Sequence, residues 1–521
     1  MSKMTRREFG KKFMQGITGV AVASSLSSAA AKSGASQVSN QPNIVFICSD
    51  QHAYKYTGYM GHDYVKTPHL DSIAKQGVTF TDNYSGAPVC VPGRSCMMTG
   101  TYASDNHSYG NSTVWDGTHL TWSALMRDAG YHTWATGKMD MNDEHDLGFV
   151  EGEVGNGHQR NPDITELFRR PVAYRTGERP NVDGRPRDDR HQDAERTQQT
   201  VDFIRNRSQQ LNKPWAAYVG LTQPHPSFVA LRKYYDYYYP AKVDMPNIPP
   251  GHLEDLHLAF QELRHFKRIA TPIPEERIRR ARAGYYGMIT ELDEYIGQLW
   301  RAVEDTGQLE NTIFIYTSDH GESLGEHGLW YKNNLYDVGI RVPLVMAGGG
   351  LPAGKVINRP VSHVDLIRTL LEWSGAGTHP DLRGTSLSPL IAGESDAGPP
   401  FVYAENHSEG NTTGSFMIRK GDWKYLHFTW YDDLLFNLSD DPGEFENRID
   451  DPDAASIRDG LRSILHSQVD PEAVTRSAFQ AEEQMLREMA DSMTEDELFE
   501  TFRGRLGEGL ARSLAARAKG R

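Results

Sequence analysis

The chain has 521 residues, enough for one large α/β domain with a smaller companion. Its contents of 38% apolar and 24% charged residues are typical of a soluble enzyme or binding protein, and beyond the N-terminus no apolar run is long enough to span a bilayer. The net charge of −14 excludes a general attraction to nucleic acid or anionic membranes, so an anionic substrate would need local cations.

The first 31 residues have the order of regions found in an export signal. A basic region up to Lys12 is followed by a mildly apolar stretch at 13–26 and then by three alanines ending at Ala31. The Arg6-Arg7 pair resembles the twin-arginine type. We therefore expect residues 1–31 to be a cleaved signal peptide, the twin-arginine export machinery to be a partner, and the protein to be periplasmic or secreted. Removing five basic residues and one acidic residue would lower the net charge from −14 to −18.

Short apolar runs then alternate with helical patterns. Strands are expected at 43–48, 131–136, 215–221, 312–316 and 343–346, and helices at 67–77, 121–130 and 275–303. This alternation predicts an α/β fold with a large, mostly parallel sheet sandwiched by helices, whose ligands bind at the carboxyl ends of the strands.

The C-terminal part has a different pattern. Short alternating runs from Phe401 predict a small antiparallel sheet, and residues from about 453 predict a helical tail that serves packing or oligomerisation. We expect a catalytic domain at 42–400, an antiparallel subdomain at 401–452 and a helical tail at 453–521.

Two apolar strands end in similar tripeptides, Ser49-Asp50-Gln51 and Ser318-Asp319-His320. Carboxylate and amide oxygens suit Ca²⁺ or Mg²⁺, and the imidazole leaves Mn²⁺ or Zn²⁺ open. The alternative is that each aspartate caps a turn, which is common after a strand. The shared preceding serine favours a metal site.

The stretch from Cys90 to Gly100 places a thiol at the start of a predicted helix and Arg94 one turn later. A helix N-terminus and a fixed cation both attract anions, so Cys90 is expected to face one. The alternative is a small buried thiol beside a surface charge. The three cysteines, Cys48, Cys90 and Cys96, are too few and too clustered for a disulfide framework.

Three further residues follow predicted strands or lie in loops: Lys138, His225 and Lys332. Singly, each fits a solvated charge or a structural histidine. Together they would neutralise an anion and supply a proton.

The motif Cys90-x-Pro92-x-Arg94, followed by Thr99-Gly100, resembles that of type I sulfatases of the alkaline phosphatase superfamily, and the resemblance covers about residues 42–445. It implies an alkaline phosphatase-like fold. It also implies that a formylglycine-generating or sulfatase-maturating enzyme oxidises Cys90 to formylglycine before export, and that the hydrate of this residue is the nucleophile. A thiolate would leave a stable adduct, whereas the second hydroxyl of a hydrate expels sulfate by re-forming the aldehyde.

The same resemblance assigns the other roles. It implies a metal, Ca²⁺ with Mn²⁺ or Mg²⁺ as alternatives, held by Asp50, Gln51, Asp319 and His320 and completed by the modified Cys90. Arg94 and Lys138 would steady the nucleophile and the sulfate oxygens. Lys332 would contact sulfate or bridging oxygens, and His225 would protonate the leaving alcohol.

Some positions depart from the commonest family pattern. Gly93 stands where serine is usual, and Asp50-Gln51 replaces Asp-Asp, as in the branch of choline sulfatases and phosphonate monoester hydrolases. Asp140 replaces a histidine and is expected to orient Lys138 or bind a substrate hydroxyl. Asn111 matches an asparagine that this branch places near the leaving oxygen.

We expect the substrate to be a sulfated carbohydrate, cleaved by S–O fission. Long polar loops bearing Arg and Tyr, at about 150–195 and 228–245, would frame a hydroxyl-rich ligand. The alternatives are a phosphonate or phosphate monoester hydrolase, a small-molecule sulfatase acting on choline or aryl esters, and a sulfoglycan-binding protein with unmodified Cys90. Choline sulfate is less favoured because no aromatic cage for a quaternary ammonium is evident.

Overall fold

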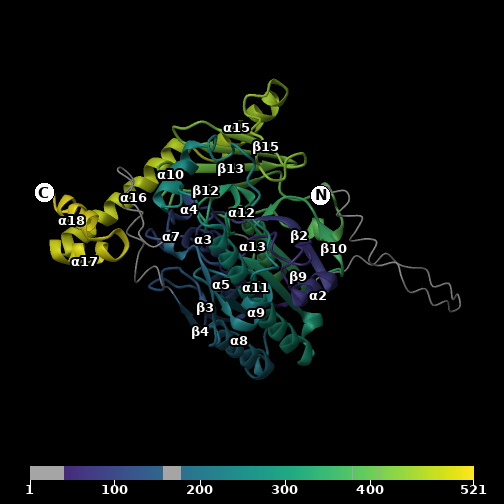
Figure 1. The fold of residues 1–521 in the computed structure, drawn as a ribbon. Coiled ribbons are helices and arrows are strands. Elements are labelled where there is room, and N and C mark those ends of the chain that lie inside the picture. Colours follow the sequence, from purple (N-terminus) through teal and green to yellow (C-terminus); the bar gives the residue numbers. More distant parts are fainter. Residues whose placement is uncertain (1–39, 156–177, 378, 409, 521) are drawn as a thin grey trace.

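The computed structural model describes residues 40–155 and 178–520, apart from 378 and 409 (Figure 1). The predicted signal peptide and part of the polar stretch at 150–195 lie outside the described residues. Within the described part, no helix combines the length and the apolar character needed to cross a bilayer.

A nine-stranded sheet forms the centre, in the order β10-β2-β9-β8-β1-β6-β3-β4, with β11 paired to β2. Among the described strands of this sheet, β9 alone runs antiparallel to its neighbours. The predicted α/β fold with a mostly parallel sheet is therefore confirmed. The strands are β1 (Asn43–Ser49), β2 (Gly77–Tyr84), β3 (His132–Lys138), β4 (Glu151–Gly155), β6 (Trp215–Gly220), β8 (Thr312–Ser318), β9 (Arg341–Gly348), β10 (Lys355–Ile357) and β11 (Val361–Ser362).

Helices cover both faces of this sheet. Successive side chains of a strand point to opposite faces, so a strand made of apolar residues throughout needs a packed layer on each side. Ile44 and Phe46 of β1 pack in one buried cluster, and Val45 and Ile47 pack in another. The first face is covered by α3 (Cys90–Thr99), α5 (Trp122–Asp128) and α13 (His363–Ser374). The second is covered by α2 (Pro68–Gln76), α8 (Asp193–Asp202) and α11 (Glu275–Asp305).

Two features of the sheet were not predicted from the sequence. Residues 77–84 form β2, where no strand was expected. The strand expected at 343–346 is present as β9, but it runs antiparallel to β8. The chain between β8 and β9 contains only short helical turns and lacks a crossover helix that would return it to the starting edge. The next strand must therefore begin at the edge where β8 ends, and this makes β9 antiparallel.

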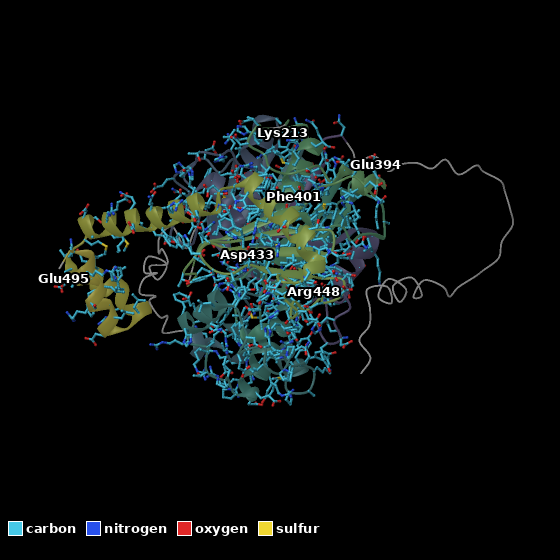
Figure 2. The ribbon with its side chains drawn as sticks, turned by 90° about the horizontal axis from the view of Figure 1, so that it is seen from above. Lys213, Glu394, Phe401, Asp433, Arg448 and Glu495 are labelled. Atoms are coloured by element: carbon cyan, nitrogen blue, oxygen red, sulfur yellow. The ribbon has the colours of Figure 1, made fainter. Side chains whose placement is uncertain are left out.

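The C-terminal part forms an antiparallel four-stranded sheet, β12 (Val402–Asn406), β13 (Ser415–Lys420), β14 (Trp423–Phe428) and β15 (Leu434–Asn437). It is followed by α15 (Ala455–Gln468), α16 (Pro471–Ser492), α17 (Glu495–Leu506) and α18 (Glu508–Ala518). Helix α16 projects from the body and carries α17 and α18 at its far end (Figure 1). Glu495, at the start of α17, accordingly lies far from Asp433 and Arg448 beside the small sheet (Figure 2). The predicted antiparallel sheet and helical tail are confirmed.

The remaining elements lie around this frame. A two-stranded sheet pairs β5 (Gly184–Arg187) with β7 (Phe228–Leu231). The other helices are α4 (Ala103–Asn106), α7 (Glu178–Asn181), α9 (Arg232–Tyr238), α10 (Leu258–Phe266), α12 (Asp337–Ile340) and α14 (Ser388–Ala392).

Candidate active site

The candidate site lies where neighbouring parallel strands end together. Asp50 follows β1 and Asp319 follows β8, and these strands pair in register with Ser49 opposite Ser318. Lys138 ends β3, which is separated from β1 by β6 alone. Because parallel strands end at the same edge of a sheet, three positions far apart in the sequence become neighbours.

Cys90 comes to the same edge by way of β2. Because β2 and β8 are each antiparallel to β9, they run in the same direction, and the short loop after β2 leads directly to Cys90. Cys90 is the first residue of α3, and Val89 before it has extended backbone. The side-chain oxygen of Asn111 accepts a hydrogen bond from the Val91 N–H at 3.1 Å. One unpaired donor of the helix start is thus satisfied, and Asn111 is placed beside Cys90.

The ligand atoms of Asp50, Cys90, Asp319 and His320 all lie within 4.8 Å of one another, and all four side chains are buried. Cys90 Sγ is 3.3 Å from His320 Nε2 and 3.7 Å from Asp50 Oδ1. Two buried carboxylates this close repel each other unless cations lie between or beside them. The cluster therefore needs cationic partners.

Three cationic side chains surround the cluster. Arg94 Nε donates to Asp319 at 2.9 Å, and Lys138 Nζ donates to Asp50. Lys332 Nζ is 2.8 Å from Cys90 Sγ, and Lys138 Nζ is 3.5 Å from the same atom. Any anionic group held against Cys90 would therefore be in contact with two ammonium groups.

These charges shift the pKa values of the cluster. Burial alone would raise the pKa of Asp50, and Cys90 adds to this, but Lys138, His225 and Arg94 hold it below its usual value. Burial and the nearby Asp50 raise the pKa of Asp319 above its usual value despite the opposing effect of Arg94. The two carboxylates thus differ in acidity because their cationic partners differ.

Gln51 lies beside this cluster. Its backbone N–H donates to Asp319 Oδ1 at 3.0 Å, and its side-chain Nε2 donates to Glu322. Its Oε1 is buried and accepts no hydrogen bond. A buried acceptor left without a donor costs about 1–3 kcal/mol, which a cation at this position would offset. Two carboxylates, an amide oxygen and an imidazole form a donor set that fits a hard divalent metal.

The remaining predicted residues lie around this cluster. Asp140 Oδ2 is 3.0 Å from Lys138 Nζ, and together with Asp50 it outweighs burial and raises the pKa of Lys138. His225 is half-buried, its Nδ1 is 2.6 Å from the Pro226 carbonyl oxygen, and its charge lowers the pKa of Asp50. The structure thus brings every predicted site residue to one edge of the sheet. The catalytic and binding roles of these residues stay predictions.

The loop that carries Lys332 has an unusual backbone. Tyr331 and Asn333, on either side of Lys332, have φ of 67° and 78°, a region that residues other than glycine seldom adopt. The neighbouring structure holds the loop in place: the Asn333 N–H donates to the Pro88 carbonyl oxygen at 3.1 Å, and the Asn406 amide donates to the Asn333 carbonyl oxygen at 2.9 Å. Such strain persists only where surrounding contacts impose it, and it is frequent in functional loops.

Sequence reasoning did not identify the residues that support these groups. Tyr218 OH accepts from Arg94 Nη1 at 2.8 Å and donates to the Lys138 carbonyl oxygen at 3.1 Å. Lys267 Nζ donates to the carbonyl oxygens of Trp330 and Lys332 at 3.1 and 2.7 Å. The one available signal was Tyr218, a polar group inside a strand that is otherwise apolar.

One structural expectation near the site is wrong. Within the stretch 228–245, predicted as a polar loop, residues 228–238 form β7 and α9. Tyr234, Tyr235 and Tyr238 are buried, and two of them, Tyr235 and Tyr238, pack in a cluster with α11 residues. Their spacing along a helix turns them toward the protein interior, so they contribute packing rather than a ligand surface.

Comparison with known proteins agrees with this geometry. The Sulfatase family profile matches residues 42–376, and the profile for the C-terminal part of N-sulphoglucosamine sulphohydrolase matches residues 325–470. The chain is 30% identical to arylsulfatase K of Danio rerio over 475 residues, covering 87% of this chain and 88% of that protein. It is 29% identical to a choline-sulfatase of Rhizobium meliloti over 434 residues, covering 79% and 83%.

Solved structures with the same fold include a phosphonate monoester hydrolase of Agrobacterium radiobacter, with a TM-score of 0.67, 26% identity, and coverage of 82% of this chain and 95% of that one. The profile match spans more than half of the chain and contains the whole buried cluster of Asp50, Cys90, Asp319 and His320. The chain therefore belongs to the sulfatase family and is an enzyme of the sulfuric ester hydrolase class.

Proposed function

We propose that the protein releases inorganic sulfate from a sulfated carbohydrate, using a formylglycine made from Cys90 and a divalent metal. One observation supports this most strongly: the Cys90 side chain points into a buried cluster of metal-ligand type, and two ammonium groups lie within 3.5 Å of its Sγ. In the modified residue, the hydrate oxygens would replace that sulfur atom.

The metal would be held by Asp50, Gln51, Asp319 and His320, with the modified residue 90 completing the set. Ca²⁺ is the proposed ion, with Mn²⁺ or Mg²⁺ as alternatives, because most of these ligand atoms are oxygens. When bound, it lowers the pKa of the attacking hydroxyl and takes up charge on the transferring group.

The protein side chains supply the rest. Lys332 and Lys138 bind the sulfate oxygens and orient the residue at position 90. Arg94 donates a hydrogen bond to Asp319 and thereby fixes the position of this carboxylate. His225 donates a proton to the oxygen of the leaving alcohol as the S–O bond breaks. Its Nδ1 contact with the Pro226 carbonyl oxygen orients the ring, so that Nε2 is the nitrogen that serves as the acid.

The carbohydrate substrate is supported by the C-terminal profile match, whose name refers to N-sulphoglucosamine sulphohydrolase. Asp140 and Asn111 are the proposed contacts for substrate hydroxyl and leaving oxygens. The sequence features of residues 1–31 support export by the twin-arginine route to the periplasm or medium, with maturation of Cys90 in the cytoplasm beforehand.

Intact mass of the peptide that contains residue 90, taken from the source organism, tests the nucleophile. Thiol-to-aldehyde conversion lowers its mass by about 18 Da, and a peptide with only free thiol would overturn the mechanism. A panel of defined sulfated saccharides, beside choline sulfate and an aryl sulfate, then identifies the substrate class from released sulfate. Full activity of Cys90→Ala would contradict the assignment.

A second candidate function is phosphonate or phosphate monoester hydrolysis, which the likeness to phosphonate monoester hydrolases at 26% identity favours. Rates on the sulfate and phosphate esters of one alcohol separate the two functions. We expect the sulfate ester to react faster, and a strong preference for the phosphate ester would favour the second function.

A further inference from the structure

Glu322 is a buried carboxylate that is 0% exposed. It lies two residues after His320. Its Oε2 accepts from Gln51 Nε2, and its Oε1 accepts from the backbone N–H groups of Leu324 and Tyr331, each at 2.7 Å. Three donors therefore converge on one carboxylate.

The contact with Gln51 fixes the orientation of that amide. An amide has a donor end and an acceptor end, and a carboxylate can pair only with the donor end. Because Nε2 is taken by Glu322, Oε1 is directed elsewhere, and it is this oxygen that is buried without a hydrogen bond. A donor at the same place would repel a cation.

The Gln51 backbone is held just as firmly. Gln51 has φ of 72°, and Tyr285 OH donates to its carbonyl oxygen at 2.7 Å while accepting from the Ala53 N–H at 3.1 Å. These contacts fix the backbone of residue 51, and the bond to Glu322 fixes the orientation of its side-chain amide.

The second oxygen of Glu322 reaches the other side of the site. Its bond to the Tyr331 N–H supports the residue directly before Lys332, whose Nζ is 2.8 Å from Cys90 Sγ. One carboxylate thus connects the proposed metal ligand to the loop that carries the nearest cation.

We propose that Glu322 is a positioning residue that makes Gln51 present its amide oxygen to the metal and holds the loop carrying Lys332. This inference rests on the metal-ligand role proposed above for Gln51. Groups that orient metal ligands typically contribute a factor of about 10–100 in metal affinity or activity.

A reciprocal exchange tests it. In Glu322→Gln, the oxygen of the new amide still accepts from the two backbone N–H groups, and its Nε2 points toward Gln51. The Gln51 amide must then turn its own oxygen toward this new donor and away from the metal. The double variant Gln51→Glu/Glu322→Gln restores the pair with its polarity reversed, so that a carboxylate oxygen again faces the cluster. Glu405→Gln is the matched control, because Glu405 is equally buried and accepts from Ser104 and His407.

The measurement is calorimetric titration of the metal-free full chain with Ca²⁺, Mg²⁺ and Mn²⁺, with thermal denaturation of each variant as a check on folding. We expect Glu322→Gln to lose at least about tenfold in metal affinity, and the double variant to recover most of it. The control variant Glu405→Gln should bind metal with the affinity of the wild-type protein.

Three results would overturn the proposal. Unchanged affinity in Glu322→Gln would remove the orienting role, and a double variant no better than the single one would show that polarity is not what matters. If the wild-type protein binds none of the three ions, the proposed metal site itself is refuted, and the role of Glu322 is refuted with it.

Discussion

Lys267 offers a direct test of how the loop that carries Lys332 is held in place. The residue is 1% exposed, and its ammonium donates to the backbone carbonyl oxygens of Trp330 and Lys332. Replacing it by methionine keeps the length of the side chain and removes both hydrogen bonds. The two carbonyl groups then lose their donor in a place that water does not reach.

The magnitude follows from two opposing contributions. Two hydrogen bonds from a charged group contribute about 1.5–3 kcal/mol each, while keeping an ammonium buried costs several kcal/mol, which the substitution removes. We therefore expect Lys267→Met to lower the free energy of unfolding by only about 1–3 kcal/mol. The effect on catalysis should be larger, because a shift of about 1 Å in the position of Lys332 Nζ costs about 100-fold in rate.

The assay is a double-mutant cycle of Lys267→Met and Lys332→Met, followed by kcat and by chemical denaturation. If Lys267 acts through Lys332, each single variant loses kcat and the double variant is no slower than Lys332→Met. Lys355→Met is the control, because Lys355 also donates to a backbone carbonyl, that of Ile391, away from the site. Wild-type kcat in a Lys267→Met protein with lowered stability would refute the reasoning. So would a double variant whose loss in kcat equals the product of the losses in the two single variants.

Three other predictions concern the support of the site and the effect of pH. Tyr218→Phe removes the hydroxyl that accepts from Arg94, and we expect a stability loss of about 1–3 kcal/mol with a fall in kcat at nearly constant KM, measured by denaturation and steady-state kinetics. Gly93→Ser should destabilise the start of α3, because a Cβ there would lie 2.9 Å from the Ala87 carbonyl oxygen; an unchanged melting temperature would show that the loop moves aside. Burial raises the pKa of Asp293 to about 7, above its unfolded value of about 4, so this group contributes stability at low pH that is lost as the pH rises through 7. That loss amounts to about 4 kcal/mol. In Asp293→Asn, the difference in unfolding free energy between pH 4 and pH 8 should therefore be smaller than in the wild-type protein. An unchanged difference would contradict the raised pKa of Asp293.

Local patterns in the chain were enough to predict the main fold. Apolar runs such as 43–48 and 312–316 are buried on both faces, which specifies central parallel strands, and the polar residues directly after them must lie at one edge. The matching Ser-Asp pairs that follow these two strands predict Asp50 and Asp319 as parts of one metal site. The direction of β9 was not predictable in this way, because it depends on the absence of a crossover helix after β8.

By itself, the sequence determined the α/β class, the strand-end carboxylates, the Cys90 helix start and the helical tail, because each of these follows from residue types within a few positions of one another. Only the tertiary structure showed that Glu322, Tyr218 and Lys267 support the site. Their hydrogen bonds reach partners that are distant in the chain, such as Gln51 and Lys332, and a buried partner is chosen by position in space rather than by residue pattern.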